Sequence, residues 1–149
     1  PVKGLQSGEI QFLYAPTHLN PTYEYGVTFE RGTAVTYGDR KQIFISGTAS
    51  IDNQGEIMYP GDILKQTERM LENIDTLLQE AGGGLQDIMQ AIVYLRDPAD
   101  YVVVKQYIES RYPSFLHLIV HAPVCRPGWL IETECIAVIP ADAPQYAYL

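Results

Sequence analysis

The side chains best suited to chemistry lie together near the end of the chain, in the stretch VCRPGWLIETECIAV. Cys125, Arg126 and the only tryptophan, Trp129, come shortly before a carboxylate, Glu132. A carboxyl group can transfer protons when burial or a neighbouring acid raises its pKa. A guanidinium can bind a carboxylate ligand through paired hydrogen bonds. This combination therefore indicates acid–base chemistry on a small anionic molecule.

The same stretch has the alternation of a β-strand over residues 130–139, in which side chains two positions apart lie on one face. Glu132 and Glu134 then share a face at a spacing of roughly 7 Å. A solvent-exposed strand face is the plainer interpretation of two such acids, and a general acid is the functional one. Cys125 precedes the strand on a turn, where a free cysteine is more often a small buried hydrophobic residue than a nucleophile.

Composition sets limits on the protein class. The 149 residues fit a single domain spanning 1–149, and no apolar run is long enough to cross a membrane. A net charge of −8 without a cluster of Lys and Arg argues against a nucleic-acid partner. The two cysteines form no disulfide framework, so we expect a cytoplasmic protein. Neither the cysteines nor the histidines have the spacing of a metal site, and we expect no metal or cofactor.

The periodic segments predict the elements that position these residues. Residues 1–30 lack a sustained period and are predicted to form an irregular arm. The segment SGTAS at 46–50 is predicted to form a small-residue turn that ends a strand, where backbone N–H groups can approach an anion. The order β-β-α-β-α-β predicts an α+β fold in which two helices cover one face of a mixed sheet. The predicted strands are 33–37, 42–46, 89–96, 118–120 and 130–139. The predicted helices are 62–81 and 97–112. Asp62 caps the first helix and Gly82 ends it, and the second helix begins with Asp97 and Pro98.

Four motifs in this order resemble the Rid family, also called YjgF or endoribonuclease L-PSP: FISGTASID, QTERMLENIDTLLQEAG, DIMQAIVYLRD and IETECIAV. The resemblance covers residues 28–139. It implies a chorismate-mutase-like α+β fold and a homotrimer with a small-molecule cleft between neighbouring subunits. The exposed face of the last strand would then line a cleft.

The fragment APVCRPGWLIE further resembles the C-terminal lobe of the chorismatases, which hydrolyse chorismate with release of pyruvate. In that group a cysteine or small residue precedes a catalytic glutamate by seven positions, which is the spacing of Cys125 and Glu132. The main hypothesis is therefore a chorismatase-like hydrolase in which Glu132 protonates the methylene carbon of an enol ether.

The resemblance also suggests how the substrate would be held. Arg31 and Arg126 are the candidate partners of its carboxylates, and Tyr23 or Tyr25 from the arm are candidate hydrogen-bond donors. Trp129 would form a wall of the cleft.

Two alternatives stand beside this hypothesis, a second enzyme and a protein without turnover. Imine and enamine deaminases of the Rid family bind the substrate carboxylate with an arginine about fifteen residues before the glutamate, where this chain reads His117, Leu118 and Ile119. A deaminase built on this chain therefore needs a different carboxylate-binding group. The second alternative is a regulatory trimer that binds a ligand without turnover, and ribonuclease activity is disfavoured by the net charge.

Overall fold

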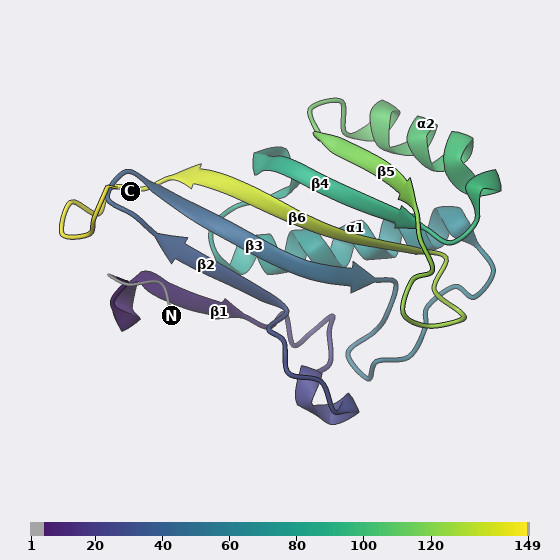
Figure 1. The fold of residues 1–149 in the computed structure, drawn as a ribbon, viewed down its shortest axis with the longest axis horizontal. Helices are drawn as coiled ribbons and strands as arrows, with labels where there is room; N and C mark the ends of the chain where they lie inside the picture. The colour runs from purple at the N-terminus through teal and green to yellow at the C-terminus, as the bar shows by residue number, and fades with distance from the viewer. Residues whose placement is uncertain (1–4, 149) are drawn as a thin grey trace.

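The protein folds around one six-stranded sheet accompanied by two α-helices (Figure 1). The structure is a computed structural model that describes residues 5–148, apart from the side chain of Tyr25. The strands are β1 (Ile10–Leu13), β2 (Gly32–Thr36), β3 (Arg40–Ala49), β4 (Ile88–Leu95), β5 (His117–His121) and β6 (Ile131–Pro140), and the helices are α1 (Ile63–Glu80) and α2 (Tyr101–Arg111).

The strands lie in the order β1-β2-β3-β6-β4-β5. Neighbouring strands are antiparallel except β4 and β5, which run parallel because α2 provides the crossover between them. The predicted α+β class with a mixed sheet and two helices is confirmed. The full order is β-β-β-α-β-α-β-β, in which β1 is an additional strand at one edge and β5 contains the predicted strand 118–120 at the other edge.

The segment predicted as an irregular arm contains the edge strand β1, which pairs with β2 through Phe12 and Thr33. Four residues are too few for an alternating pattern to stand out in a sequence. The following residues do lack long regular structure and form only a 3-10 turn, Thr22–Tyr25, before β2 begins.

Helix α1 begins and ends as predicted. The Asp62 carboxylate accepts a hydrogen bond from the backbone N–H of Lys65 at 3.0 Å, and Gly82 takes a φ of +89°, which favours glycine. The predicted cap of the second helix also forms, since the Asp97 carboxylate accepts from Ala99 N–H at 2.9 Å. One 3-10 turn, Pro98–Asp100, then leads into α2. Among residues 5–148, neither helix has the length and apolarity required to cross a lipid bilayer.

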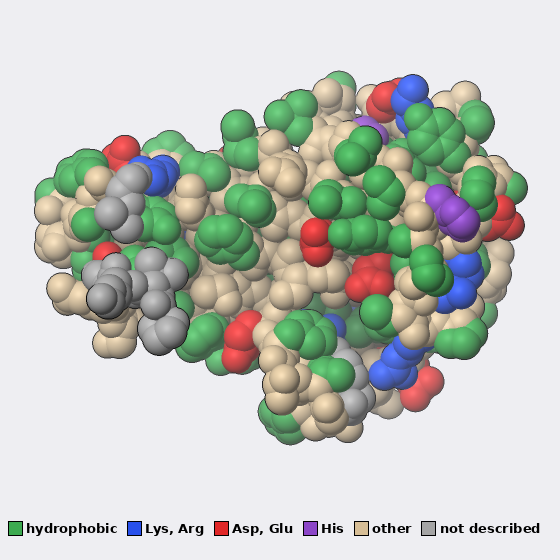
Figure 2. Space-filling view, in the orientation of Figure 1, with side chains coloured by type: hydrophobic (Ala, Val, Ile, Leu, Met, Phe, Trp, Pro, Cys, Tyr) green, Lys and Arg blue, Asp and Glu red, His purple; other side chains and the backbone are tan. Residues whose placement is uncertain are grey.

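The two faces of the sheet have different environments. One face packs against α1, which passes behind the sheet in Figure 1, and its side chains belong to a continuous apolar core. The opposite face carries no helix of the described chain and is seen in Figure 2 as hydrophobic side chains with acidic ones among them. We call this surface the open face, defined by the mutually paired strand positions Phe12, Phe44, Ile92, Tyr94, Leu118, Glu132, Glu134 and Ile136.

Candidate functional site

The residues predicted to act together line one cavity of about 230 Å3 where β3 ends and β6 begins. The lining includes Glu132, Cys125, Arg126, Arg31 and Trp129. The structure therefore brings the predicted acid, thiol, tryptophan and two guanidinium groups to one place. Their roles remain predictions. Val27, Phe29, Gly47, Ala49 and Ile51 complete the lining.

Glu132 is the second residue of β6 and is paired with Ala49 on β3 and Tyr94 on β4. Its side chain is half-buried, and this burial raises the pKa of the Glu132 carboxyl above its ordinary value. Hydrogen bonds from the backbone N–H and thiol of Cys125 oppose the rise, and the nearby charge of Glu134 adds to it. A carboxyl whose protonated form is favoured in this way is suited to donate a proton.

Gly47 makes room for this carboxyl. A Cβ atom at position 47 would lie 2.3 Å from Oε1 of Glu132, so any larger residue would displace the acid. The sheet register shifts between Ile45 and Thr48, which is a β-bulge. The interpretation of SGTAS as a turn that ends a strand is therefore wrong, because residues 46–49 belong to β3 and only Ser50 follows the strand.

The two cysteines have different surroundings. Cys125 is exposed, and its backbone N–H and thiol hydrogen-bond to the Glu132 carboxyl. Cys135 is buried on the helix-covered face of β6, where burial raises the pKa of its thiol to about 12. Cys135 therefore stays a neutral thiol that fills the core.

Two guanidinium groups reach the cavity from opposite ends of the chain. Arg31 is buried, with Nη2 donating to the carbonyl and the side-chain oxygen of Asn20, each at 2.9 Å. Arg126 is exposed, and its guanidinium carbon lies 5.6 Å from the centre of the Trp129 ring. The indole Nε1 of Trp129 is buried without a hydrogen-bond partner among the described residues. Positive charge thus lies in the same cavity as the acid.

The predicted tyrosine donors are not placed at this cavity by the described side chains. Tyr23 is 77% exposed and lines a separate cavity of about 300 Å3, formed mainly by the segment before β2. That cavity shares only Arg31 with the one around Glu132. Within one chain Tyr23 therefore lies apart from the Glu132 cavity, and its role as a hydrogen-bond donor stays a prediction. The Tyr25 side chain lies outside the described part of the chain.

The second acid lies apart from the first. Glu134 is exposed and contributes to a different cavity of about 280 Å3 on the open face, together with Phe44 and Gln90. The hydroxyl of Tyr94 hydrogen-bonds to Glu134, and burial together with this carboxylate raises the pKa of Tyr94. Glu134 therefore influences Glu132 through its charge and does not line the Glu132 cavity.

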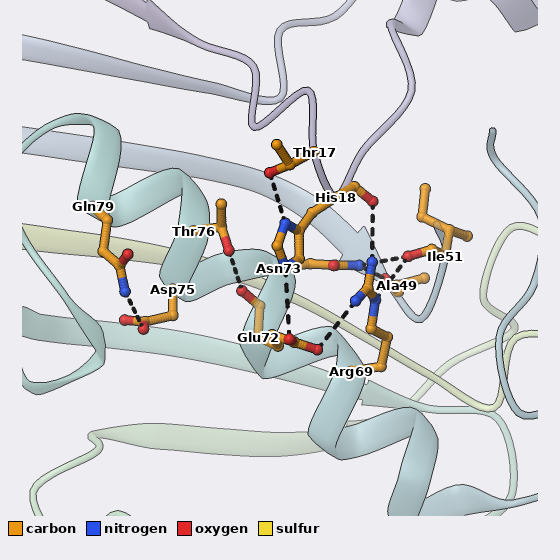
Figure 3. Close-up of polar contacts among 10 residues, drawn as sticks. All are labelled: Thr17, His18, Ala49, Ile51, Arg69, Glu72, Asn73, Asp75, Thr76 and Gln79. Atoms are coloured by element: carbon orange, nitrogen blue, oxygen red, sulfur yellow. Dashed lines mark hydrogen bonds and ion pairs between the residues drawn. The ribbon is translucent and has the colours of Figure 1, made fainter. Parts of the chain in front are cut away.

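Polar residues on the buried side of α1 support the cavity, and sequence reasoning missed them. Asn73 is fully buried and donates to the carbonyls of Ala49 and Ile51, both at 3.0 Å (Figure 3). Arg69 donates to Ile51 as well, at 3.1 Å, so two helix residues fix one wall of the cavity. The signal in the sequence is a polar residue at a position next to the apolar stripe of α1.

Metal-ligating residues do not gather near this cavity. Within residues 5–148 there is no group of three or more His, Cys, Asp or Glu side chains that could hold a metal ion. His18 lies 3.5 Å from Glu72, and Nδ1 of His117 lies 2.8 Å from the carbonyl of Phe115. These two histidines therefore have local protein partners.

Comparisons with known proteins agree with this architecture. The family model described as endoribonuclease L-PSP matches residues 32–139. The 3-aminoacrylate deaminase RutC of Acinetobacter baylyi is 31% identical over 97 residues, covering 64% of this chain and 77% of that protein. A RutC family protein of Pyrococcus abyssi is 35% identical over 97 residues, covering 64% of this chain and 76% of the relative.

Solved structures share the fold at lower identity. RidA from the Antarctic bacterium Psychrobacter superposes with a TM-score of 0.70 at 24% identity, covering 87% of this chain and 99% of that structure. The Rid family protein YyfA of Yersinia pestis gives a TM-score of 0.73 at 19% identity, covering 87% and 99%. These similarities concern the fold alone.

Proposed function

The chain belongs to the endoribonuclease L-PSP family, also called the Rid or YjgF family, and on this premise we propose that it hydrolyses a small enamine or imine of a carboxylic acid and releases ammonia. The observation that carries the proposal is the half-buried Glu132 carboxyl, with its raised pKa, in a cavity also lined by Arg31 and Arg126. The relative named as a 3-aminoacrylate deaminase favours this reaction. The chorismatase-like hydrolysis that the sequence suggested first gains no such support.

Proton transfer by Glu132 is enough to drive this reaction. In its protonated form the carboxyl donates to the enamine carbon that does not bear the nitrogen, which converts the enamine to an iminium ion. Water then adds to the iminium carbon while the Glu132 carboxylate takes one proton from that water. The carboxyl, protonated again, gives this proton to the nitrogen of the carbinolamine. The C–N bond then breaks with release of ammonia, while the hydroxyl becomes the carbonyl and returns its proton to the Glu132 carboxylate. One water is consumed for each ammonia released.

The carboxylate of the substrate requires a cation, and the cavity offers two. Arg126 is the more exposed of the pair, and the adjacent Trp129 ring restricts its guanidinium through the contact at 5.6 Å. Arg31 lines the same cavity, where its bonds to Asn20 keep it in place. This arrangement would replace the arginine that deaminases of the family carry earlier in the chain, at the position where this sequence reads His117 to Ile119.

The size of the cavity also favours a small substrate. Pockets for drug-sized ligands are larger, on the order of 300 to 1,000 Å3, whereas this cavity measures about 230 Å3. A three- or four-carbon amino or imino acid fits this volume.

A homotrimer belongs to the same proposal. Three large hydrophobic side chains of the open face are substantially exposed: Phe12 at 48%, Phe44 at 40% and Leu118 at 62%. Exposed apolar side chains spread across a sheet face without a covering helix favour its burial against another chain. Sedimentation velocity of the wild type is expected to give a trimer, and a monomer would refute the assembly.

Ammonia release tests the proposed reaction. An amino-acid oxidase can generate 2-imino acids in the assay, and the 3-aminoacrylate enamine provides the second substrate class. We expect the protein to accelerate ammonia release from at least one class above the spontaneous rate. A parallel incubation with chorismate, in which pyruvate is measured, is expected to show none.

Two results would contradict the proposal. Ammonia release at the spontaneous rate with both substrate classes would exclude the deaminase, and pyruvate release from chorismate would restore the chorismatase-like reaction. Tight binding of these compounds in calorimetry without any turnover would instead indicate the ligand-binding trimer.

A further inference from the structure

Most of the groups proposed to act with Glu132 are carried by an irregular segment, residues 124–130, which we call the site loop. It bears Cys125, Arg126 and Trp129 and contains no helix or strand. Within the loop, the backbone N–H of Trp129 donates a hydrogen bond to the Arg126 carbonyl at 3.0 Å. Irregular backbone of this kind depends on outside partners to keep one conformation.

Arg96, which directly follows β4, supplies the largest set of these partners. Its Nε donates to the carbonyl of Trp129 at 2.7 Å, and its Nη2 donates to the carbonyl of Val124 at 2.8 Å. The same Nη2 also donates to the carbonyl of Arg126. One half-buried guanidinium therefore binds the beginning, the middle and the end of the site loop.

Gln66 of α1 also binds the end of the site loop. Its fully buried side chain donates to the Gly128 carbonyl at 3.1 Å and accepts from Leu130 N–H at 3.0 Å. The backbone N–H of Arg96 donates to the Leu130 carbonyl at 3.0 Å. The loop end is thus fixed by a helix and a strand, whereas the part around Cys125 is fixed by the Arg96 side chain.

We propose that Arg96 is a positioning residue of the site, which holds the site loop so that the N–H and thiol of Cys125 stay on the Glu132 carboxyl. This inference rests on the proposed role of Glu132, although the loop geometry can be tested without any substrate. A neutral side chain can also donate to a loop carbonyl. The guanidinium of Arg96 differs because it is charged and planar, so it binds several carbonyls in a defined arrangement.

The protonation of Glu132 gives a readout that a purely structural role would not move. The Cys125 hydrogen bonds lower the pKa of the Glu132 carboxyl and so oppose the effect of burial. The packing of Glu132 against Gly47 comes from β3 and does not depend on the site loop. If Arg96 is removed, the hydrogen bonds from Cys125 weaken while this packing remains, so the pKa of Glu132 rises further.

The experiment is a titration of the Glu132 carboxyl by NMR in protein labelled with 13C at the glutamate side chains, with the resonance assigned by its loss in Glu132→Gln. We expect Arg96→Met to raise the pKa of Glu132, and Arg96→Lys, which keeps the charge with fewer donors, to raise it less. The matched control is Lys41→Met, since Lys41 Nζ donates to the Ala81 carbonyl at 2.8 Å at the far end of β3. This control is expected to leave the Glu132 titration as in the wild type.

A wild-type titration of Glu132 in folded Arg96→Met, or a fall of the pKa, would overturn the inference. If Arg96→Met does not fold, Arg96→Lys decides in the same way. In the ammonia assay, kcat/KM of Arg96→Met is expected to fall roughly 10-fold or more because the reacting groups are displaced. Absence of deaminase activity in the wild type would refute the proposed function, whereas the NMR result alone decides the role of Arg96.

Discussion

The two faces of β6 show how one strand can serve both stability and chemistry. On the helix-covered face, Ile131, Thr133 and Ala137 are completely buried and belong to positions packed under the helices. On the open face, Glu132 is half-buried and Glu134 is exposed, one position away from that core. The chain can therefore vary the chemistry of the open face without altering the packing that forms the fold.

The contrast depends on how water reaches each face. A side chain under α1 loses water entirely and contributes through apolar burial and dispersion. A carboxyl on the open face keeps part of its hydration, so its pKa is raised without the group being forced to remain neutral. Substitutions on the helix-covered face should therefore affect mainly the free energy of unfolding, and substitutions on the open face mainly the activity.

The largest effect is expected for a truncation on the helix-covered side. Leu77 of α1 is 0% exposed in the core, and Leu77→Ala should lower the free energy of unfolding by about 2 to 5 kcal/mol because it leaves a cavity. Denaturant unfolding measures this loss. The control is Val102→Ala on α2, where the side chain is 60% exposed and a change below about 0.5 kcal/mol is expected. Equal effects of the two substitutions would refute the packing described for α1.

Gly47→Ala should separate activity from stability. The new methyl group would occupy the place of Glu132 Oε1, so the flexible carboxyl must move while the backbone can remain. We expect kcat/KM for ammonia release to fall about 10- to 100-fold, with a thermal midpoint close to that of the wild type. Full activity in this variant would show that the position of Glu132 is not critical.

Asn73→Ala tests the connection between the two faces. Asn73 lies on the buried side of α1 and bonds to the carbonyls of Ala49 and Ile51, which line the cavity (Figure 3). Losing both donors should lower the free energy of unfolding by about 1 to 3 kcal/mol, since two buried carbonyls are left without this partner. The measurement is again denaturant unfolding, and a neutral effect would mean that water or another donor replaces the amide.

The smallest effect is expected for Glu134→Gln. The Glu134 carboxylate raises the pKa of Glu132, so removing its charge should lower that pKa. A general acid acts in its protonated form, and therefore the decline of kcat/KM with rising pH should begin at a lower pH than in the wild type. A pH profile that stays unchanged, or moves to higher pH, would contradict the described coupling between the acids.

The sequence predicted those parts of the fold that have a clear period. Helix α1 and strand β6 have long apolar patterns and recognisable end residues, so both were predicted close to their observed bounds. Strand β1 was missed because it is short and is defined only by its pairing with β2. Local pattern does not reveal a pairing partner that lies about twenty residues further along the chain.

The candidate site shows the same difference between residues that the sequence predicted and residues that it missed. Glu132, Cys125, Arg126 and Trp129 are close in sequence, and their meeting in one cavity follows from a turn and a strand. The supporting contacts of Arg96, Gln66 and Asn73 join segments that are far apart in the chain, so they become visible only in the folded structure. The position of Tyr23 at a separate cavity of the same chain was not predicted, because the path of an irregular segment cannot be read from its composition.

The most direct test of the account compares two isosteric substitutions on the open face, Glu132→Gln and Glu134→Gln, in the same ammonia-release assay. Glutamine keeps the size of each side chain but cannot donate the carboxyl proton. We predict that Glu132→Gln lowers kcat about 100-fold or more, whereas Glu134→Gln changes it less than about 10-fold at the optimal pH. Equal losses in the two variants, or a fully active Glu132→Gln enzyme, would contradict the claim that Glu132 is the proton donor.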